Sequence, residues 1–262
     1  MTLEEKITRI NELYHLSQER PLNEEELAEQ KALRTDYLNA IRASVKGQLS
    51  QIEIEEQDGS RHGLVSINDK KKELRTLCRD IRKNISEERR LEAEDNLIRE
   101  FVRLAKILRC EKVLLYSSLP DEVSTDKLFE TLRKEGITCY FPQVTMEGLK
   151  FYSIKMLEEL LPGRYSVREP IGSIDVRIDP NEVPNGESLL ILVPGLAFDG
   201  EGYRIGYGKG YYDAYLSEHA QGVNIKSVGV CMKECKAEDI EGWDGGIPVN
   251  RNDVKTDVVL FV

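Results

Sequence analysis

The chain has 262 residues, of which 40% are hydrophobic and 32% are charged, and its formal net charge is −10. This length allows one large domain or two smaller ones, with enough apolar residues for a sizeable core. The acidic balance argues against a broad surface for nucleic acid or anionic lipid, but it leaves room for a local basic pocket that binds phosphate.

Targeting signals and cysteines also limit the class of protein. The sequence contains no apolar run of membrane-spanning length, and the charged N-terminal stretch MTLEEKITRINELYHL lacks the apolar core of a signal peptide. The five cysteines are odd in number and scattered, which is typical of reduced thiols. We therefore expect a cytoplasmic protein with neither a membrane nor a nucleic acid as partner.

Residues 1–57 predict a small two-helix hairpin. Thr2 with Glu5, and Asn23 with Glu26, have the spacing of a capping box, and Pro21 separates the two helices. The short connection makes the helices antiparallel neighbours. Because two helices bury little surface, we expect the hairpin to self-associate or to dock on an unidentified protein. The apolar stripes are Leu3, Ile7, Ile10 and Tyr14, then Leu33, Tyr37, Ile41 and Val45.

A turn-rich linker is predicted over residues 58–65, and a second domain over residues 66–262. Helical patterns occur at 71–85, at 87–108 after a cap at Ser86, and at 125–134. Their alternation with β-type runs predicts an α/β fold, with a largely parallel sheet and helices on both faces, preceded by the all-α hairpin. The predicted strands are 112–118, 137–142, 149–154, 188–194, 226–232 and 257–262.

One glycine-rich segment, VPGLAFDGEGYRIGYGKGYYDAYL (193–216), begins where the apolar strand 188–194 should end. Ligands of such sheets bind beyond the carboxyl ends of the strands. The segment is not a Walker A loop, because Tyr203 and Gly210 occupy positions that need Gly and Ser or Thr. It is not a dinucleotide fingerprint either, because Tyr211 occupies a position that needs Gly.

The glycines of this segment are still suited to phosphate. In an extended backbone, Gly206, Gly208 and Gly210 would leave one side bare, with Tyr207, Lys209 and Tyr211 on the other side. A bare backbone lets an oxyanion approach the amide N–H groups, and glycine permits the positive φ of an anion-binding nest.

The residues that flank the glycines supply charge. Lys209 and Arg204 add positive charge, and a helix beginning near YYDAYL would favour an anion at its N-terminus. Asp213, in the first turn of that helix, could hold a magnesium ion that bridges phosphates. The competing interpretation is a simple glycine-rich turn in which Tyr211 and Tyr212 pack into the core.

The segment as a whole resembles the signature of the 5-formyltetrahydrofolate cyclo-ligase family, approximately PGLxFDxxGxRLGxGxGYYDxxL, with Ile205 in place of Leu. The resemblance covers about residues 66–262. It includes KKELR (71–75), similar to an N-terminal Lys-x-x-x-Arg, and LPDEVST (119–125), similar to a strand-end loop with a folate-facing glutamate. It also includes YSVREP (165–170), with Ser166 where Gly is common, and PVNRNDVKTDVVL (248–260), with Asn252 where many bacterial members have His.

The resemblance implies an enzyme that uses ATP and Mg²⁺ to convert 5-formyltetrahydrofolate to 5,10-methenyltetrahydrofolate through a phosphorylated formyl oxygen, releasing ADP and phosphate. It implies metal ligands at Asp213 and Asp253, and folate contacts at Ser117, Glu122 and Tyr211. It assigns catalysis to Lys209, Arg204 and Tyr211. The implied ATP contacts are Lys71, Arg75, Arg204, Ile205, Gly206, Tyr207, Gly208, Lys209, Gly210, Tyr211 and Tyr212.

Each of these residues also has a simpler interpretation. Lys71 and Arg75, one helical turn apart, could be a solvated pair. Glu122 could be a first-turn carboxylate that the helix dipole favours, and Asp199 and Asp253 could be turn formers. At the level of function, the alternatives are a regulator that senses a nucleotide or sugar phosphate while its hairpin contacts a partner, and an inactive enzyme kept as an interaction module.

The hairpin carries a separate resemblance. EKITRINEL and LNEEELAEQKALRTDYLNAIRASVKGQL are similar to the YnzC-like family, short bacterial helical hairpins of uncharacterised role. This resemblance implies a fold and says little about function.

Overall fold

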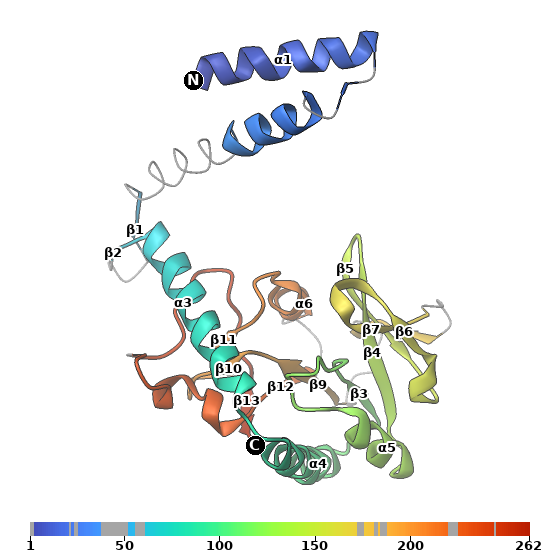
Figure 1. Cartoon of the computed structure of the whole chain (residues 1–262). Helices are drawn as coiled ribbons and strands as arrows, with labels where there is room; N and C mark the ends of the chain where they lie inside the picture. The colour runs from blue at the N-terminus through green and yellow to red at the C-terminus, as the bar shows by residue number, and fades with distance from the viewer. Residues whose placement is uncertain are drawn as a thin grey trace. The chain divides into compact units, whose positions relative to one another are not determined.

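The structure is a computed structural model that describes residues 3–20, 22–23, 26–37, 52–55, 61–171, 176–180, 183, 188–219, 225–243 and 245–262. The chain divides into two compact units, Met1–Asp69 and Lys70–Val262 (Figure 1). The division falls within helix α3 (Leu64–Lys83), and the linker over residues 58–65 stays a prediction. No helix among the described residues is both long and apolar enough to cross a membrane.

The first unit contains the predicted helical hairpin. Helix α1 (Leu3–Glu19) and the helix of residues 26–37 are antiparallel. Lys6, nearer the start of α1, pairs at 2.8 Å with Asp36, near the end of the second helix. Arg9, further along α1, pairs at 2.9 Å with Glu29, nearer the start of the second helix. Leu13 and Leu33 are buried. A two-stranded ladder of β1 (Glu53–Glu55) and β2 (Arg61–Gly63) follows.

One of the two predicted caps lies within the described residues. The N–H of Glu26 donates to Asn23 Oδ1 at 2.8 Å, and the N–H of Asn23 donates to Glu26 Oε2 at 2.9 Å, so this capping box is confirmed. Thr2, Pro21, Ile41 and Val45 lie outside the described residues.

The second unit is built on a seven-stranded sheet of order β13-β12-β9-β3-β4-β5-β8. The five strands from β13 to β4 are mutually parallel, and β5 and β8 add antiparallel pairs at one edge, so the predicted largely parallel sheet is confirmed. The strands are β3 (Lys112–Leu114), β4 (Thr138–Thr145), β5 (Gly148–Ser153), β8 (Arg177–Ile178), β9 (Leu189–Pro194), β12 (Ile225–Cys231) and β13 (Val258–Phe261).

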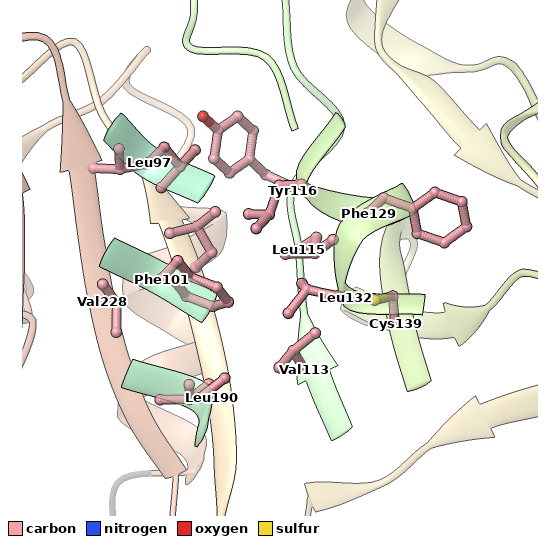
Figure 2. Packing of buried hydrophobic residues seen from close by; sticks show 14 of the residues in the cluster. Leu97, Phe101, Val113, Leu115, Tyr116, Phe129, Leu132, Cys139, Leu190 and Val228 are labelled. Atoms are coloured by element: carbon pink, nitrogen blue, oxygen red, sulfur yellow. The ribbon is translucent and has the colours of Figure 1, made fainter. Parts of the chain in front are cut away.

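Helices cover both faces of this sheet, as predicted. On one face, α4 (Glu87–Ile107) places Leu97 and Phe101 against the sheet, next to α5 (Asp126–Lys134) (Figure 2). On the other face, α6 (Tyr211–His219) packs on alternate residues of β9. The two sets of β9 side chains are Leu190 and Leu192 toward α4, and Leu189, Ile191 and Val193 toward α6.

Four of the predicted strands differ in length from the structure, among them the first two. The predicted strand 112–118 is assigned only over β3, although the N–H of Leu115 still donates to Tyr140 O at 2.8 Å. The predicted strand 137–142 continues to Thr145, because a two-residue turn joins it to the antiparallel β5. The predicted cap of α4 is confirmed, since Ser86 Oγ accepts the N–H of Arg89 at 3.2 Å.

Two small ladders stand beside the main sheet. Strands β6 (Leu160–Pro162) and β7 (Arg168–Pro170) pair antiparallel, as do β10 (Ala197–Phe198) and β11 (Arg204–Ile205). The ring of Phe198 lies against Gly229 in β12, where an added Cβ would come within 2.3 Å of the ring. The second ladder is therefore fixed against the sheet where β12 has no side chain.

Candidate active site

The strand order locates the expected ligand edge. Taken in chain order, the parallel strands β3, β4, β9, β12 and β13 follow a 2-1-3-4-5 arrangement, which reverses direction between β3 and β9. Ligands of doubly wound sheets bind beyond the carboxyl ends of the strands at this reversal. The segments that leave β3 and β9 there are residues 115–122 and 195–213, which carry most of the predicted site residues.

Asp199 shapes the glycine-rich segment from inside the protein. Its Oδ1 accepts the N–H groups of Glu201 and Tyr203, and its Oδ2 accepts the N–H of Ile247, at 2.9 to 3.1 Å. The chain then turns at Gly202, whose φ is +98° and whose missing Cβ would lie 2.5 Å from Thr256 O. Asp199 is therefore a buried turn former, as the sequence suggests.

The backbone of residues 206–210 is bent rather than extended. Gly208 and Gly210 have φ values of +91° and +71°, in the left-handed region that glycine favours. The side chains therefore do not alternate as they would on an extended backbone, whereas the positive φ that glycine permits does occur. Tyr207 contacts Asp121, whereas Lys209 contacts Tyr165, with Nζ 5.2 Å from the ring centroid.

Helix α3 brings two predicted basic residues to this loop. Arg75 Nε donates to Gly206 O at 2.8 Å, and its guanidinium lies beside Gly208, where an added Cβ would meet it at 3.4 Å. Lys71, one turn earlier, is buried, and its Nζ lies 2.5 Å from Asp253 Oδ2. The solvated-pair interpretation of Lys71 and Arg75 is therefore wrong, since both side chains are committed to contacts distant in sequence.

The two predicted metal ligands, Asp213 and Asp253, lie in segments that contact each other. Asp213, in the first turn of α6, has its Oδ1 2.8 Å from Arg204 Nη2. The same Oδ1 accepts the N–H of Val254 at 3.1 Å, and Val254 directly follows Asp253. Arg204 is buried and also donates to Val254 O at 2.8 Å. Burial lowers the pKa of Arg204, and the charges of Asp213 and Asp253 oppose this effect.

This arrangement fits a hard cation. Asp213 Oδ2 and Asp253 Oδ1 accept no hydrogen bond from the part of the chain that the structure describes. Within that part, no group of three or more His, Cys, Asp and Glu is placed to hold a metal. Two carboxylates completed by water or phosphate oxygens are the kind of site that Mg²⁺ prefers.

Tyr211 and Tyr212 begin helix α6 and differ in their surroundings. The Tyr211 and Tyr165 hydroxyls lie 3.4 Å apart at the edge of the site. Tyr212 packs against the cores on both faces of the sheet, and burial raises its pKa. Tyr212 thus matches the core-packing interpretation, whereas Tyr211 packs against one of these cores and also contacts Tyr165.

The predicted folate residues follow β3. The hydroxyl of Ser117 is buried and finds no hydrogen-bond partner in the described residues. Glu122 Oε2 accepts the N–H of Leu119 at 2.9 Å. Burial raises the pKa of Glu122 to about 7, against the lowering effects of that N–H and of the Arg82 charge. A buried hydroxyl without a partner and a carboxyl with a raised pKa are features that ligand-binding loops often show.

Three residues of the site were missed in the sequence. Arg82 had a usable signal, because it continues the buried stripe Leu74–Cys78 at the same four-residue spacing on α3. A charged residue inside an apolar stripe is rarely buried unless it is paired. Asp121 and Tyr165 carried no comparable signal, since each lies in a loop or turn and contacts residues distant in sequence.

A surface hollow of about 460 Å³ lies elsewhere on the second unit. It includes Lys112 and Thr138, the first residues of β3 and β4, and therefore lies at the amino ends of these strands. The candidate site lies at the opposite ends, so this hollow plays no part in it.

Comparison with known proteins gives the following similarities. Residues 67–262 match the model of the 5-formyltetrahydrofolate cyclo-ligase family. The chain is 28% identical over 204 residues to the mouse 5-formyltetrahydrofolate cyclo-ligase, covering 75% of this chain and 96% of the mouse protein. The NMR structure of an Aquifex aeolicus 5,10-methenyltetrahydrofolate synthetase, 31% identical, covers 72% of this chain and 88% of that one with a TM-score of 0.58.

The hairpin matches a different family. Residues 5–61 match the model described as a bacterial protein of unknown function (DUF896). A UPF0291 protein of Lachnospira eligens is 46% identical over 71 residues, which cover 27% of this chain and 84% of that protein. The YnzC-like resemblance is therefore confirmed, and the two parts of the chain have separate relatives.

Proposed function

Because the chain belongs to the 5-formyltetrahydrofolate cyclo-ligase family, we propose that it catalyses the ATP- and Mg²⁺-dependent cyclisation of 5-formyltetrahydrofolate to 5,10-methenyltetrahydrofolate, with release of ADP and phosphate. The observation that carries the ATP and metal part is the meeting of the loop 206–210 with Arg75, Arg204 and two carboxylates at one edge of the sheet.

The chemistry requires no nucleophile from the protein. The formyl oxygen of the folate attacks the γ-phosphorus of ATP, and ADP leaves with the electrons of the broken P–O bond. The folate N10 then attacks the activated formyl carbon, closes the ring and displaces phosphate, while the N10 proton is lost. Positioning and charge stabilisation are therefore the main tasks of the protein.

The bent glycine loop would receive the phosphates. Two of its residues adopt left-handed φ values, which let successive N–H groups turn toward one anion. Lys209 lies on this loop and is exposed, so its amine can reach a transferring phosphoryl group. Arg75 and Arg204 hold the two ends of the loop through Gly206 O and Asp213, and would keep it in position as charge develops.

Magnesium would be held by Asp213 and Asp253, and when bound it would neutralise charge on the phosphates. Lys71 is paired with Asp253 at 2.5 Å, so its ammonium would lie beside the same phosphates. On the folate side, Ser117, Glu122 and Tyr211 would contact the substrate. The pKa of Glu122 is about 7, so this carboxyl would be about half protonated at neutral pH.

Formation of the methenyl-folate absorbance band tests the proposal. The full chain is mixed with 5-formyltetrahydrofolate and Mg-ATP, and parallel reactions omit ATP or contain excess EDTA. We expect the band only in the complete reaction, with one ADP released per methenyl product. Binding of ATP without any product would contradict the proposal and favour the regulatory alternative.

A further inference from the structure

We propose that Arg82 is a positioning residue that fastens the Glu122 loop, residues 119–122, to the start of the glycine-rich segment. This inference rests on the proposed function, because it assigns Arg82 a part in presenting Glu122 to the folate. Arg82 lies near the end of α3, a helix that also supplies Lys71 and Arg75.

The contacts of the Arg82 guanidinium join the segments that leave β3 and β9. Nη2 donates to the carbonyl oxygens of Gly195 and Leu196, which follow the last residue of β9. Nη1 donates to Asp121 O at 3.4 Å and lies 3.7 Å from Asp121 Oδ2. One planar group therefore contacts both segments at the reversal of the sheet, where the ligand is expected.

The burial of Arg82 indicates that its charge and its planar shape are both used. The residue is 3% exposed, and its Nε has no hydrogen-bond partner among the described residues. A buried guanidinium is costly unless its charge is used, so a hydrophobic residue would serve better if packing alone mattered. Lysine would keep the charge but lose the planar fork that reaches several carbonyls together.

The charge of Arg82 acts on Glu122. Arg82 is the cation whose field lowers the pKa of Glu122, opposing the larger effect of burial. Loss of this charge would therefore move the titration of Glu122 to higher pH. The titratable and charged groups that act with Glu122 come from several elements, namely Arg82 on α3, Asp121 beside it, Tyr116 after β3, Tyr207 on the glycine loop and Tyr212 on α6.

A second contact supports the same connection. The Tyr207 hydroxyl donates to the Asp121 carboxylate, at 3.2 Å from each oxygen. Burial raises the pKa of Tyr207, which keeps this hydroxyl protonated as a donor. Asp121, in the Glu122 loop, is thus contacted by Tyr207 of the glycine loop and by Arg82 of α3.

Hydrogen exchange on the full chain tests the fastening without any assay of activity. In Arg82→Met, we expect amides of residues 115–123 and 195–199 to exchange about 10-fold faster, the size that loss of charged hydrogen bonds predicts. Helix α5 serves as an internal reference and should be unchanged. Arg103→Met, at an exposed position on α4, is the matched control. Unchanged exchange in both segments, or an equal increase throughout the domain, would overturn the proposal.

The dependence of kcat/KM on pH tests the link to Glu122. We expect the limb that disappears in Glu122→Gln to move to higher pH in Arg82→Met and to stay in place in Arg82→Lys. Arg82→Lys should still lower kcat/KM by about 10-fold, because it keeps the charge without the planar fork. A limb that does not move in Arg82→Met would overturn the proposal.

If the unaltered chain makes no product, the proposed function fails, while hydrogen exchange still decides the role of Arg82. Should Arg82→Met fold poorly, Arg82→Lys must show faster exchange in both segments, or the proposal is wrong.

Discussion

Arg204 Nη2 lies 2.8 Å from Asp213 Oδ1, which ties the last basic residue before Gly206 to the first acidic residue after Gly210. The glycine loop is thus closed at its base by an ion pair whose arginine is buried. The same carboxylate oxygen accepts the N–H of Val254, so one side chain connects the loop, α6 and the segment of Asp253.

Asp213→Asn should lower turnover more than about 10-fold, because the amide keeps the shape of the side chain but loses the charge that would hold the metal and pair with Arg204. Turnover is measured over a range of magnesium concentrations, with circular dichroism to confirm the fold. Asp239→Asn, at an exposed carboxylate, is the control and should match the unaltered chain. Near-normal turnover of Asp213→Asn at limiting magnesium would remove Asp213 from the site.

Several elements could be predicted because their signals are local. The apolar run Leu189–Val193, the cap at Ser86 and the helix that begins at Tyr211 each depend on neighbouring residues, and all three occur in the structure. Lys71 and Arg75 were similarly evident, because residues four apart share a helix face.

The features that escaped prediction depend on contacts distant in sequence. The conformation of the glycine loop is set partly by Arg75 and Asp121, which lie more than 80 residues away along the chain. A parity argument considers only neighbouring residues and applies only to an extended backbone, so it could not show that Gly208 and Gly210 turn the chain. Tyr165 joins Lys209 and Tyr211 for the same reason, through a turn that no periodic pattern predicts.

Lys209→Met should lower kcat more than it raises the KM for ATP. The exposed amine makes no ion pair with the described residues, so it is free to follow the phosphoryl group into the transition state. Steady-state kinetics at varied ATP provide the measurement, and Lys209→Arg, which keeps the charge, should retain more of kcat. A rise in KM with unchanged kcat would instead assign Lys209 to ground-state binding of ATP.

Ser166 occupies a left-handed conformation, with φ at +62° directly after Tyr165 at +57°. This explains why glycine suits the position, since it adopts positive φ without a steric cost. The side chain is exposed, so backbone strain should dominate the effect of substitution. Ser166→Gly should leave the free energy of unfolding within about 1 kcal/mol, whereas Ser166→Val should lower it by about 1–2 kcal/mol. Urea denaturation decides this, and equal effects of the two substitutions would contradict the assignment.

Glu122 should make the stability of the second unit depend on pH. Its pKa is about 7 in the folded state against an ordinary value of 4.5, so between these values the folded state binds more protons than the unfolded state. The contribution of this group to the free energy of unfolding therefore falls as pH rises through that window. We therefore compare the free energy of unfolding of Glu122→Gln with that of the unaltered chain at each pH. This difference should favour the variant more at pH 8 than at pH 5, by up to about 3 kcal/mol. Urea denaturation at both values tests this, and a difference independent of pH would show that Glu122 is not buried as a neutral acid.

Removal of the hairpin should leave the enzyme intact. Residues 1–57 carry 7 Lys and Arg and 12 Asp and Glu, a net of −5, so the remaining residues carry 30 and 35 and also have a net of −5. The hairpin is thus no basic arm that would attract ATP, and its own ion pairs and buried leucines lie within the first unit.

A shortened chain that begins at Leu64 keeps α3 complete, with Lys71, Arg75 and Arg82. We expect it to retain the circular dichroism per residue of an α/β domain and most of the turnover. The mouse relative is matched over 96% of its length by 204 residues, which supports a catalytic domain of that size. An insoluble or inactive shortened chain, beside an active full chain, would show that the hairpin is part of the catalytic fold and that the boundary near residues 58–65 is wrong.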